Sequence, residues 1–446
     1  MAGSVFDSPL YAALFPTAEV GRLFSDSAAI RSMLLVEGAL ARVQGEQGII
    51  PGESGAAIHR ASLEVLIDPG SLAQATGQNG VAVPALVAAF RGEMQAPEHA
   101  QYVHWGATSQ DIIDTGLMLR LRQSLALIEA DLRAAIAGFG QLAVAHADLP
   151  MAARTYGQHA TPTCFGAVVA EWGAPLLGLV RELPDLRKTC LLVSLSGAAG
   201  TSSALGPEAA RTRTALARAL DLGDPGRGWH TDRTALLRIG DWMTRVTLAC
   251  GKLGGDLAAL TQSGIGEVVL AGGGASSTMP QKQNPVAPSV LVALARQGAA
   301  QNGVLQGSSI HAHQRDGAAW FSEWMCLPQI VLGAASAANI SRDLSTAISP
   351  VPARMAEALA SGLDMIHAEA LSFALATQMR RPEAQNRVKA LCREAQETGV
   401  PLGKLAKRDW PDLDVGLFDP ARQMGTAPEN ARDFATQAAA LETLGT

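Results

Sequence analysis

The sequence predicts an all-α protein built around an extended bundle of long helices. The main evidence is a proline-free segment at about 111–148, which would span roughly 55 Å as a helix. Further long amphipathic segments follow at about 232–263, 285–307 and 321–342. Alanine is abundant and aromatic residues make up only 4% of the chain, a composition that favours closely packed helices. Alanine-rich faces on long helices also suggest that other subunits complete the packing.

Shorter helices flank this bundle on both sides. One of them, at 32–47, carries apolar residues in an i, i+4, i+8 stripe and ends before Gly48 and Pro51. The residues after 350 predict a smaller helical cap, with Pro382 and Pro401 between its helices. We therefore expect three domains, at 1–108, 109–350 and 351–446.

Composition excludes several classes of protein. The 446 residues are 48% hydrophobic with a net charge of -6, typical of a globular protein with a mildly acidic surface. No run of Lys and Arg forms the basic face that a nucleic-acid partner needs, and no apolar stretch reaches the roughly 18 residues of a membrane span. The N-terminus lacks the pattern of a signal peptide. The five cysteines form no CxxC pair, so we expect free thiols in the cytoplasm.

Three polar segments interrupt the helical pattern, and the first is HWGATSQD at 104–111. It precedes the longest helix, and Ser109 or Asp111 is a candidate cap for that helix. The hydroxyl groups of Thr108 and Ser109, beside free backbone N–H groups at a helix N-terminus, suit carboxylate binding. A plain capping loop is the alternative that this segment alone leaves open.

The second polar segment is RTYGQHATPT at 154–163, which places several hydrogen-bonding side chains before an apolar run. His159 is its candidate for catalysis. A lone histidine is more often a packing residue, and the segment by itself does not decide between these interpretations.

The third polar segment is GASSTMPQKQNP at 274–285. The glycine run Gly272–Gly274 predicts a hinge for a mobile loop. A nucleotide phosphate loop is excluded, because GxxxxGK[ST] would need Ser or Thr where Gln283 follows Lys282. Lys282 and Asn284 suit binding of anionic oxygen. Ser276 and Ser277 are candidate proton carriers if donors and cations stabilise the alkoxide, and a surface loop without chemistry is the alternative.

Two further segments carry weaker signals. His311 and His313 have the side chains of metal ligands, but no nearby Cys or carboxylate completes a set, so we expect no metal site. WHTDR at 229–233 opens a long helix and provides either an anion contact or a cap.

Together the three polar segments resemble the active-site regions of the fumarase/aspartase superfamily, in the expected order. The third follows the superfamily's signature form GSSxMPxKxNP, and the resemblance covers essentially the whole chain. The chain most resembles the bacterial 3-carboxy-cis,cis-muconate cycloisomerase family, in YVHWGATSQDIIDTGL, RTYGQHATPT, WHTDR and SSTMPQKQNPV. Fumarases, adenylosuccinate lyases and argininosuccinate lyases generally carry a histidine where this sequence has Tyr156. The resemblance implies that cycloisomerases carry an aromatic residue there, commonly tryptophan, so tyrosine is close to their pattern and departs from that of the lyases.

The resemblance implies a three-domain fold and a homotetramer with a core of long helices. It implies active sites where three subunits meet, a small polycarboxylate substrate, and no cofactor or metal. The implied reaction belongs to protocatechuate degradation in the β-ketoadipate pathway. A carboxylate of 3-carboxy-cis,cis-muconate adds to a carbon–carbon double bond through an aci-carboxylate intermediate and closes a carboxymuconolactone.

The resemblance also implies residue roles. Ser276 exchanges the proton at carbon, with Ser277 as the less favoured alternative, and Lys282 holds the carboxylate on which charge develops. His159 completes the expected catalytic set. The expected substrate-binding residues are His104, Thr108, Ser109, Tyr156, Gln158, His230, Asn284 and Arg315.

Several questions stay open from the sequence. They are the acting serine, the role of Tyr156, the lactone stereochemistry, a preference for substituted muconates, and the effects of Ala275 and Gln314, which depart from the usual residues. The alternative functions are β-elimination of the adenylosuccinate lyase type and a non-catalytic structural protein that retains the fold.

Overall fold

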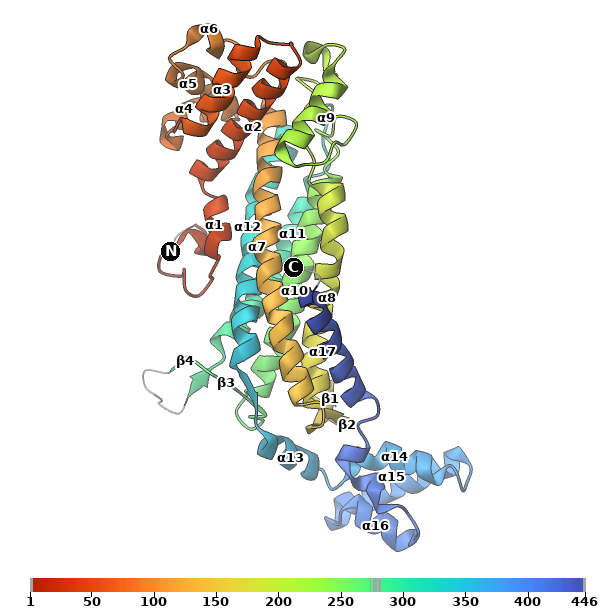
Figure 1. Cartoon of the computed structure of the whole chain (residues 1–446). Coiled ribbons are helices and arrows are strands. Elements are labelled where there is room, and N and C mark those ends of the chain that lie inside the picture. The colour runs from red at the N-terminus through yellow and green to blue at the C-terminus, as the bar shows by residue number, and fades with distance from the viewer. Residues whose placement is uncertain (1–2, 273, 276–278, 280–281, 444–446) are drawn as a thin grey trace. The chain divides into compact units, whose positions relative to one another are not determined.

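The computed structural model describes residues 3–272, 274–275, 279 and 282–443. Within them the chain is mostly helical, as the sequence predicts (Figure 1). The strands in this part of the chain form two-stranded antiparallel sheets. They pair β1 (Pro150–Thr155) with β2 (Gln158–Cys164), β3 (Val268–Leu270) with β6 (Ile348–Pro350), and β4 (Gly274–Ala275) with β5 (Gln283–Asn284).

The long helices confirm the main prediction from periodicity. The segments expected at 111–148, 232–263, 285–307 and 321–342 correspond to α7, α10, α11 and α12. The sequence predicted no long helix at α8, which continues through Pro175 and Pro184. The long helices are α7 (Ser109–Ala145), α8 (Phe165–Cys190), α10 (Thr234–Leu260), α11 (Val286–Gly307) and α12 (Gly317–Ala347).

The chain forms two compact units, and each long helix contributes residues to both. Unit 1 comprises Met1–Ala130, Leu179–Leu248 and Ala293–Asn339. Unit 2 comprises Asp131–Gly178, Ala249–Val292 and Ile340–Thr446. The expected domain boundaries at 108 and 350 stay a prediction.

In unit 1, short helices pack around the N-terminal part of α7 (Figure 1). The helix α2 begins where the Ser25 hydroxyl accepts the Ala28 N–H at 3.2 Å. Helices α2 and α3 approach closely at Gly55, where a Cβ atom would lie 2.6 Å from the carbonyl oxygen of Ala41. The short helices are α1 (Ala18–Leu23), α2 (Asp26–Glu46), α3 (Gly52–Glu64), α4 (Pro69–Asn79), α5 (Val83–Glu93), α6 (Pro97–Ala100), α9 (Ala209–Leu220), η1 (Val5–Asp7) and η2 (Ser203–Leu205).

In unit 2, helices α14, α15 and α16 share a small apolar core that includes Leu371, Val388 and Leu405 (Figure 1). The helix α15 ends at Gly399, whose φ of 71° is the left-handed conformation common at helix ends. The C-terminal elements are α13 (Pro352–Ala360), α14 (Ala368–Leu375), α15 (Arg381–Thr398), α16 (Leu402–Asp409), α17 (Ala427–Thr443), η3 (Met365–His367), η4 (Val415–Phe418) and η5 (Pro420–Arg422).

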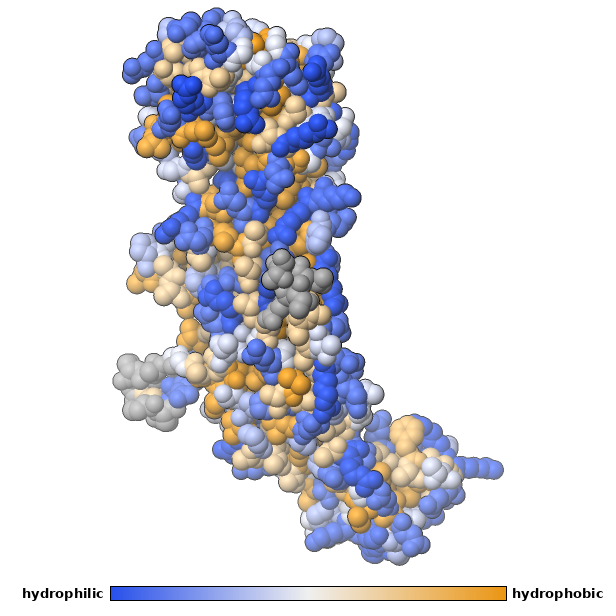
Figure 2. Space-filling model, in the orientation of Figure 1, coloured by the Kyte–Doolittle hydropathy of each residue, from blue (hydrophilic) through white to orange (hydrophobic). Residues whose placement is uncertain are grey.

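The surface mixes charged and apolar residues along the long helices (Figure 2). Exposed apolar side chains on these helices include Leu248, Val304 and Met325. All five cysteines are free thiols, as predicted, and four of them are buried. None of the helices in the described part of the chain has both the length and the apolar character of a membrane span.

Candidate functional site

The N-terminus of α7 is fixed by Asp111, which has no exposed surface. The Thr108 N–H donates to Asp111 Oδ2 at 3.1 Å, so the carboxylate reaches back to cap the start of its own helix, as the sequence predicts. Four further donors reach this carboxylate from other segments of unit 1. They are the Ser194 hydroxyl, the Ser196 and Gly197 backbone N–H groups and the His230 ring. The start of α7 is therefore tied to the segment at 194–197 and to His230.

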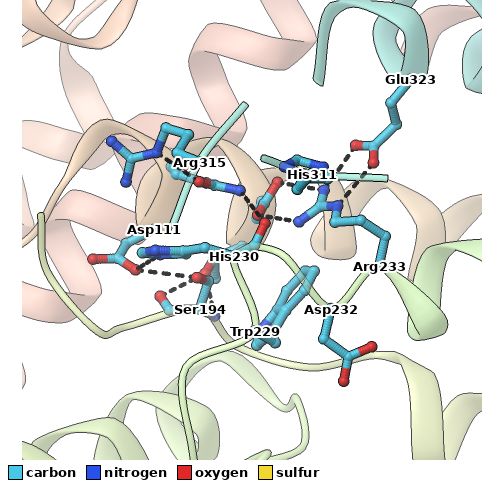
Figure 3. Close-up of polar contacts among 12 residues, drawn as sticks. Asp111, Ser194, Trp229, His230, Asp232, Arg233, His311, Arg315 and Glu323 are labelled. Atoms are coloured by element: carbon cyan, nitrogen blue, oxygen red, sulfur yellow. Dashed lines mark hydrogen bonds and ion pairs between the residues drawn. The ribbon is translucent and has the colours of Figure 1, made fainter. Parts of the chain in front are cut away.

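His230 is a buried ring at the centre of this cluster (Figure 3). Its Nε2 atom lies 2.8 Å from Asp111 Oδ1 and 3.2 Å from the Ser196 hydroxyl. Its backbone carbonyl accepts from Gln110 Nε2 at 2.9 Å. The ring is only 4% exposed. Its Nδ1 atom has no hydrogen-bond partner among the described residues.

Arg233 forms a second buried cluster beside the first (Figure 3). Its guanidinium donates to both oxygens of Asp114 at 2.7 and 3.0 Å and to both oxygens of Glu323 at 2.9 and 2.7 Å. Burial raises the pKa of Glu323, and the nearby Asp114 carboxylate adds to this effect. Burial opposes the charge on Arg233, but the two carboxylates raise its pKa overall.

Capping, one of the two roles expected for the WHTDR segment, is present in the structure, whereas an anion contact stays a prediction. The Asp232 carboxylate accepts the Thr234 N–H at 3.1 Å and caps α10. The Trp229 indole donates to the Val193 carbonyl at 2.8 Å, and the Arg233 guanidinium lies 4.9 Å from the Trp229 ring centre. These contacts hold the segment at 229–233 in place. The pairing of Arg233 with Asp114 and Glu323 is not indicated by the sequence alone.

Arg315 lies on the loop before α12 and is held by neutral groups. Its Nε donates to Gln110 Oε1 at 2.8 Å, and its NH2 donates to the Ala198 carbonyl at 3.2 Å. Gln110 thereby joins Arg315 to His230, and Asp111 joins His230 to Thr108. The structure thus brings together the predicted site residues Thr108, Ser109, His230 and Arg315 at one end of α7 in unit 1.

His104 is placed by Glu37 of α2. Its Nδ1 atom lies 2.6 Å from Glu37 Oε1. Burial opposes protonation of His104, but the hydrogen bond and charge of Glu37 raise its pKa, with a smaller contribution from Asp111. The pair favours a cationic histidine close to the start of α7.

The predicted residues Tyr156, Gln158 and His159 lie on the β1–β2 hairpin of unit 2, an element that the sequence did not predict. Tyr156 and Gly157 form its turn, with φ values of 53° and 75°, the left-handed values that a two-residue hairpin turn requires. All three predicted side chains are exposed, and Tyr156 is fully so. Close to this turn, Arg154 donates to both oxygens of the buried Glu267 at 2.6 and 2.8 Å.

The loop with the signature sequence also belongs to unit 2. Its base is closed by β4 and β5, where Gly274 pairs with Asn284. Lys282 is exposed, and its N–H donates to the Met279 carbonyl at 2.9 Å. Ser276 and Ser277 lie outside the described residues. Among the residues that are described, no hydrogen bond or ion pair joins Lys282 or Asn284 to the hairpin.

Histidines and carboxylates do not converge into a metal site in the described part of the chain. His311 accepts the Asp316 N–H through Nδ1 at 3.4 Å, and burial followed by the Arg233 charge lowers its pKa. His313 is exposed, with a φ of 53°.

Comparisons with known proteins agree with this architecture. A family model described as Lyase matches residues 16–299. The chain is 36% identical to a 3-carboxy-cis,cis-muconate cycloisomerase of Pseudomonas aeruginosa, over 94% of each chain. It is 33% identical to a nitrosuccinate lyase of Streptomyces davaonensis, over 95% of this chain and 94% of that enzyme. The crystal structure of a 3-carboxy-cis,cis-muconate lactonizing enzyme from Pseudomonas putida is similar with a TM-score of 0.90 and 32% identity, covering 98% of this chain and 100% of that one.

Proposed function

The chain belongs to the lyase family, and on this premise we propose that it is a cycloisomerase of 3-carboxy-cis,cis-muconate. The resemblance found in the three polar segments agrees with the similarity to cycloisomerases over most of the chain. The proposed product is a carboxymuconolactone, formed in aromatic catabolism through protocatechuate. A cytoplasmic location is part of the same proposal.

The observation that carries this proposal within the structure is the position of Arg315 beside the start of α7. Arg315 is bound there by an amide oxygen and a backbone carbonyl, so its charge is available to a ligand. The Thr108 and Ser109 hydroxyl groups lie at the same place, at the start of α7, whose positive dipole end already faces the Asp111 carboxylate. Glu37 raises the pKa of His104 and also compensates the charge of its ring, so the uncompensated charge of this group is that of Arg315. A substrate with several carboxylates fits these groups.

The proposed reaction conserves all atoms of the substrate. One substrate carboxylate oxygen forms a bond to an alkene carbon. The displaced electron pair moves onto the neighbouring carbon and its carboxylate, which becomes an aci-carboxylate. A proton then adds to that carbon. Because the nucleophile is part of the substrate, binding in a curled conformation supplies the proximity on which ring closure depends.

The proposed proton carrier is Ser276, with Ser277 as the alternative. Lys282 and Asn284 would hold the carboxylate on which charge develops, and preorganised donors of this kind stabilise a transition state by roughly 2.7–4 kcal/mol each. Tyr156, Gln158 and His159 would reach the substrate from the hairpin tip. His230 would contribute to substrate binding indirectly. Its ring is held by Asp111 and Ser196, so it keeps the start of α7 and the segment at 194–197 in place.

We further propose a homotetramer in which three subunits contribute to each site, with domains at 1–108, 109–350 and 351–446. Two observations support association between subunits. Tyr156 is fully exposed although the resemblance assigns it to the site. Apolar side chains of the long helices, such as Leu248 and Met325, are also exposed. Light scattering after gel filtration measures the assembly directly.

The direct test is to mix the purified protein with 3-carboxy-cis,cis-muconate and follow the loss of the conjugated diene absorbance. Nuclear magnetic resonance of the product then identifies the lactone. cis,cis-Muconate, which lacks the third carboxylate, and adenylosuccinate are the comparison substrates. Cleavage of adenylosuccinate without turnover of the carboxymuconate would replace this proposal with a β-eliminating lyase.

A further inference from the structure

Two arginines of unit 1 are held in opposite ways. Arg233 is unexposed and donates four hydrogen bonds to the carboxylates of Asp114 and Glu323. Arg315 donates to an amide oxygen and a backbone carbonyl, and no described carboxylate lies within ion-pairing distance of it. The charge of Arg233 is therefore compensated inside the protein, whereas that of Arg315 is not.

The amide of Gln110 is held at both ends. Gln110 is completely buried, and its Nε2 donates to the His230 carbonyl at 2.9 Å while its Oε1 accepts from Arg315. If the amide were flipped, its NH2 group would face the Arg315 N–H and its oxygen would face the His230 carbonyl oxygen. The two partners therefore determine the orientation of the amide. The His230 carbonyl is itself fixed, because the His230 ring is bound to Asp111.

We propose that Gln110 is a positioning residue whose neutral oxygen directs Arg315 toward a substrate carboxylate while leaving the guanidinium charge uncompensated. The carboxylate concerned is one that keeps its charge through the reaction. A glutamate at this position would hold Arg315 equally firmly but would neutralise it and repel the polyanion. The inference rests on the proposed function and deepens it, because it explains how the site selects a substrate with several carboxylates.

Replacing Gln110 by glutamate makes this idea testable through pH. A protonated glutamate has the shape of glutamine, donates its O–H to the His230 carbonyl and accepts from Arg315 through its carbonyl oxygen. Once ionised, the same side chain loses the donor and forms an ion pair with Arg315. The variant therefore resembles the natural protein at low pH and departs from it as pH rises.

The experiment measures kcat and KM for 3-carboxy-cis,cis-muconate, and by calorimetry the Kd of the inert tricarboxylate tricarballylate, from mildly acidic to alkaline pH. Gln110→Glu is expected to raise KM and Kd by about 10- to 100-fold at alkaline pH, the range for hydrogen bonds to charged groups. Its kcat changes less, because a spectator carboxylate is bound equally in ground and transition states. Both constants return toward the wild-type values as pH falls.

Two further variants separate positioning from folding. Gln110→Met has a similar length but neither donor nor acceptor, so it raises KM at every pH without recovery at low pH. The matched control is Gln44→Glu, because Gln44 is also fully buried and donates through Nε2 to a backbone carbonyl, that of Trp105, at 2.8 Å. Gln44 has no arginine partner among the described residues, so its variant is expected to lose thermal stability without a pH-dependent KM.

The outcomes distinguish this inference from the proposed function. If the wild-type protein turns over the substrate and Gln110→Glu keeps its KM and Kd at every pH, Gln110 does not position Arg315. Should Gln110→Glu fail to fold, a wild-type KM in Gln110→Met leads to the same conclusion. A wild-type protein that neither turns over the substrate nor binds tricarballylate removes the proposed function and this inference together.

Discussion

The Nδ1 atom of His104 lies 2.6 Å from the Oε1 atom of Glu37, in a contact between a loop residue and a buried carboxylate of α2. The Glu37 side chain is 1% exposed and that of His104 is 20% exposed. His104 has a φ of 65°, a left-handed conformation that few residues other than glycine adopt. The contact with Glu37 thus fixes the direction of the ring in an unfavourable backbone conformation and favours its protonated form.

The variant Glu37→Gln is expected to lower the pKa of His104, because it removes the charge that raises it. A histidine whose pKa is raised on folding stabilises the protein below its unfolded pKa, and this contribution is lost as pH rises through the folded pKa. The variant should therefore be less stable by about 1.5–3 kcal/mol at pH values below the ordinary pKa of 6.5. The difference should shrink or reverse at alkaline pH, where the wild type buries Glu37 beside a neutral ring.

Two measurements check this expectation. Proton resonance of the His104 ring gives its pKa in each protein, and urea denaturation across the pH range gives the free energy of unfolding. An unchanged His104 pKa in Glu37→Gln, or a stability difference that grows with pH, contradicts the assigned role of the pair.

The second prediction concerns Arg233, whose removal leaves two buried carboxylates without a counter-charge. Arg233→Met is expected to destabilise the fold by about 3–5 kcal/mol near neutral pH. Burial already raises the pKa of Glu323, and loss of the arginine raises it further. Protonation then relieves the variant as pH falls, so the loss of stability is largest at alkaline pH and smaller at acidic pH.

The matched control is Arg238→Met in the same unit. Arg238 pairs with Asp185 at 3.0 Å, but both side chains are exposed, at 44% and 71%. Such surface pairs contribute roughly 0–1 kcal/mol. Equal losses of stability in Arg233→Met and Arg238→Met would show that the buried ion pairs of Arg233 contribute no more than a surface ion pair.

The long helices could be predicted from the sequence, whereas α8 and the hairpin could not. Apolar residues that recur over many turns predict α7, α10, α11 and α12, although residues 330–341 of α12 are buried on every face and Pro328 lies within that helix. In α8, Pro175 and Pro184 oppose helix formation locally, and tertiary packing overrides them. The hairpin turn places Tyr156 at a positive φ, a conformation that its residue type does not indicate.

The site was only partly predictable for a related reason. The motifs identified segments with candidate substrate-binding side chains, including those of Thr108, His230 and Arg315. The partners that contact buried or positioned side chains often lie far away in the sequence, so no local sequence pattern indicates them. Arg233 is 119 residues from Asp114 and 90 from Glu323, and Gln110 is 205 residues from Arg315. Only the folded chain reveals these pairs.

The third prediction tests the close approach of α2 and α3. Gly55→Ala places a Cβ atom 2.6 Å from the Ala41 carbonyl oxygen, and such overpacking typically costs about 1–3 kcal/mol. Gly77 in α4 is the control, because it is exposed and a Cβ atom there would meet nothing within 4 Å. Gly77→Ala should instead stabilise the protein by roughly 0.4–1 kcal/mol. Thermal melting compares the two, and destabilisation by both variants would contradict the packing argument.

The last prediction concerns the loop at 274–285. Ser276→Ala should lower kcat for 3-carboxy-cis,cis-muconate by about 10²- to 10⁴-fold, the usual contribution of a positioned proton carrier, and leave the assembly intact. Ser289→Ala is the control, because its exposed hydroxyl donates only to the Pro285 carbonyl at 2.9 Å among the described residues. Ser277→Ala should keep most of the activity. If Ser277→Ala loses turnover while Ser276→Ala retains it, the neighbouring hydroxyl carries the proton, because alanine removes the transferable proton at each position without adding bulk to the loop.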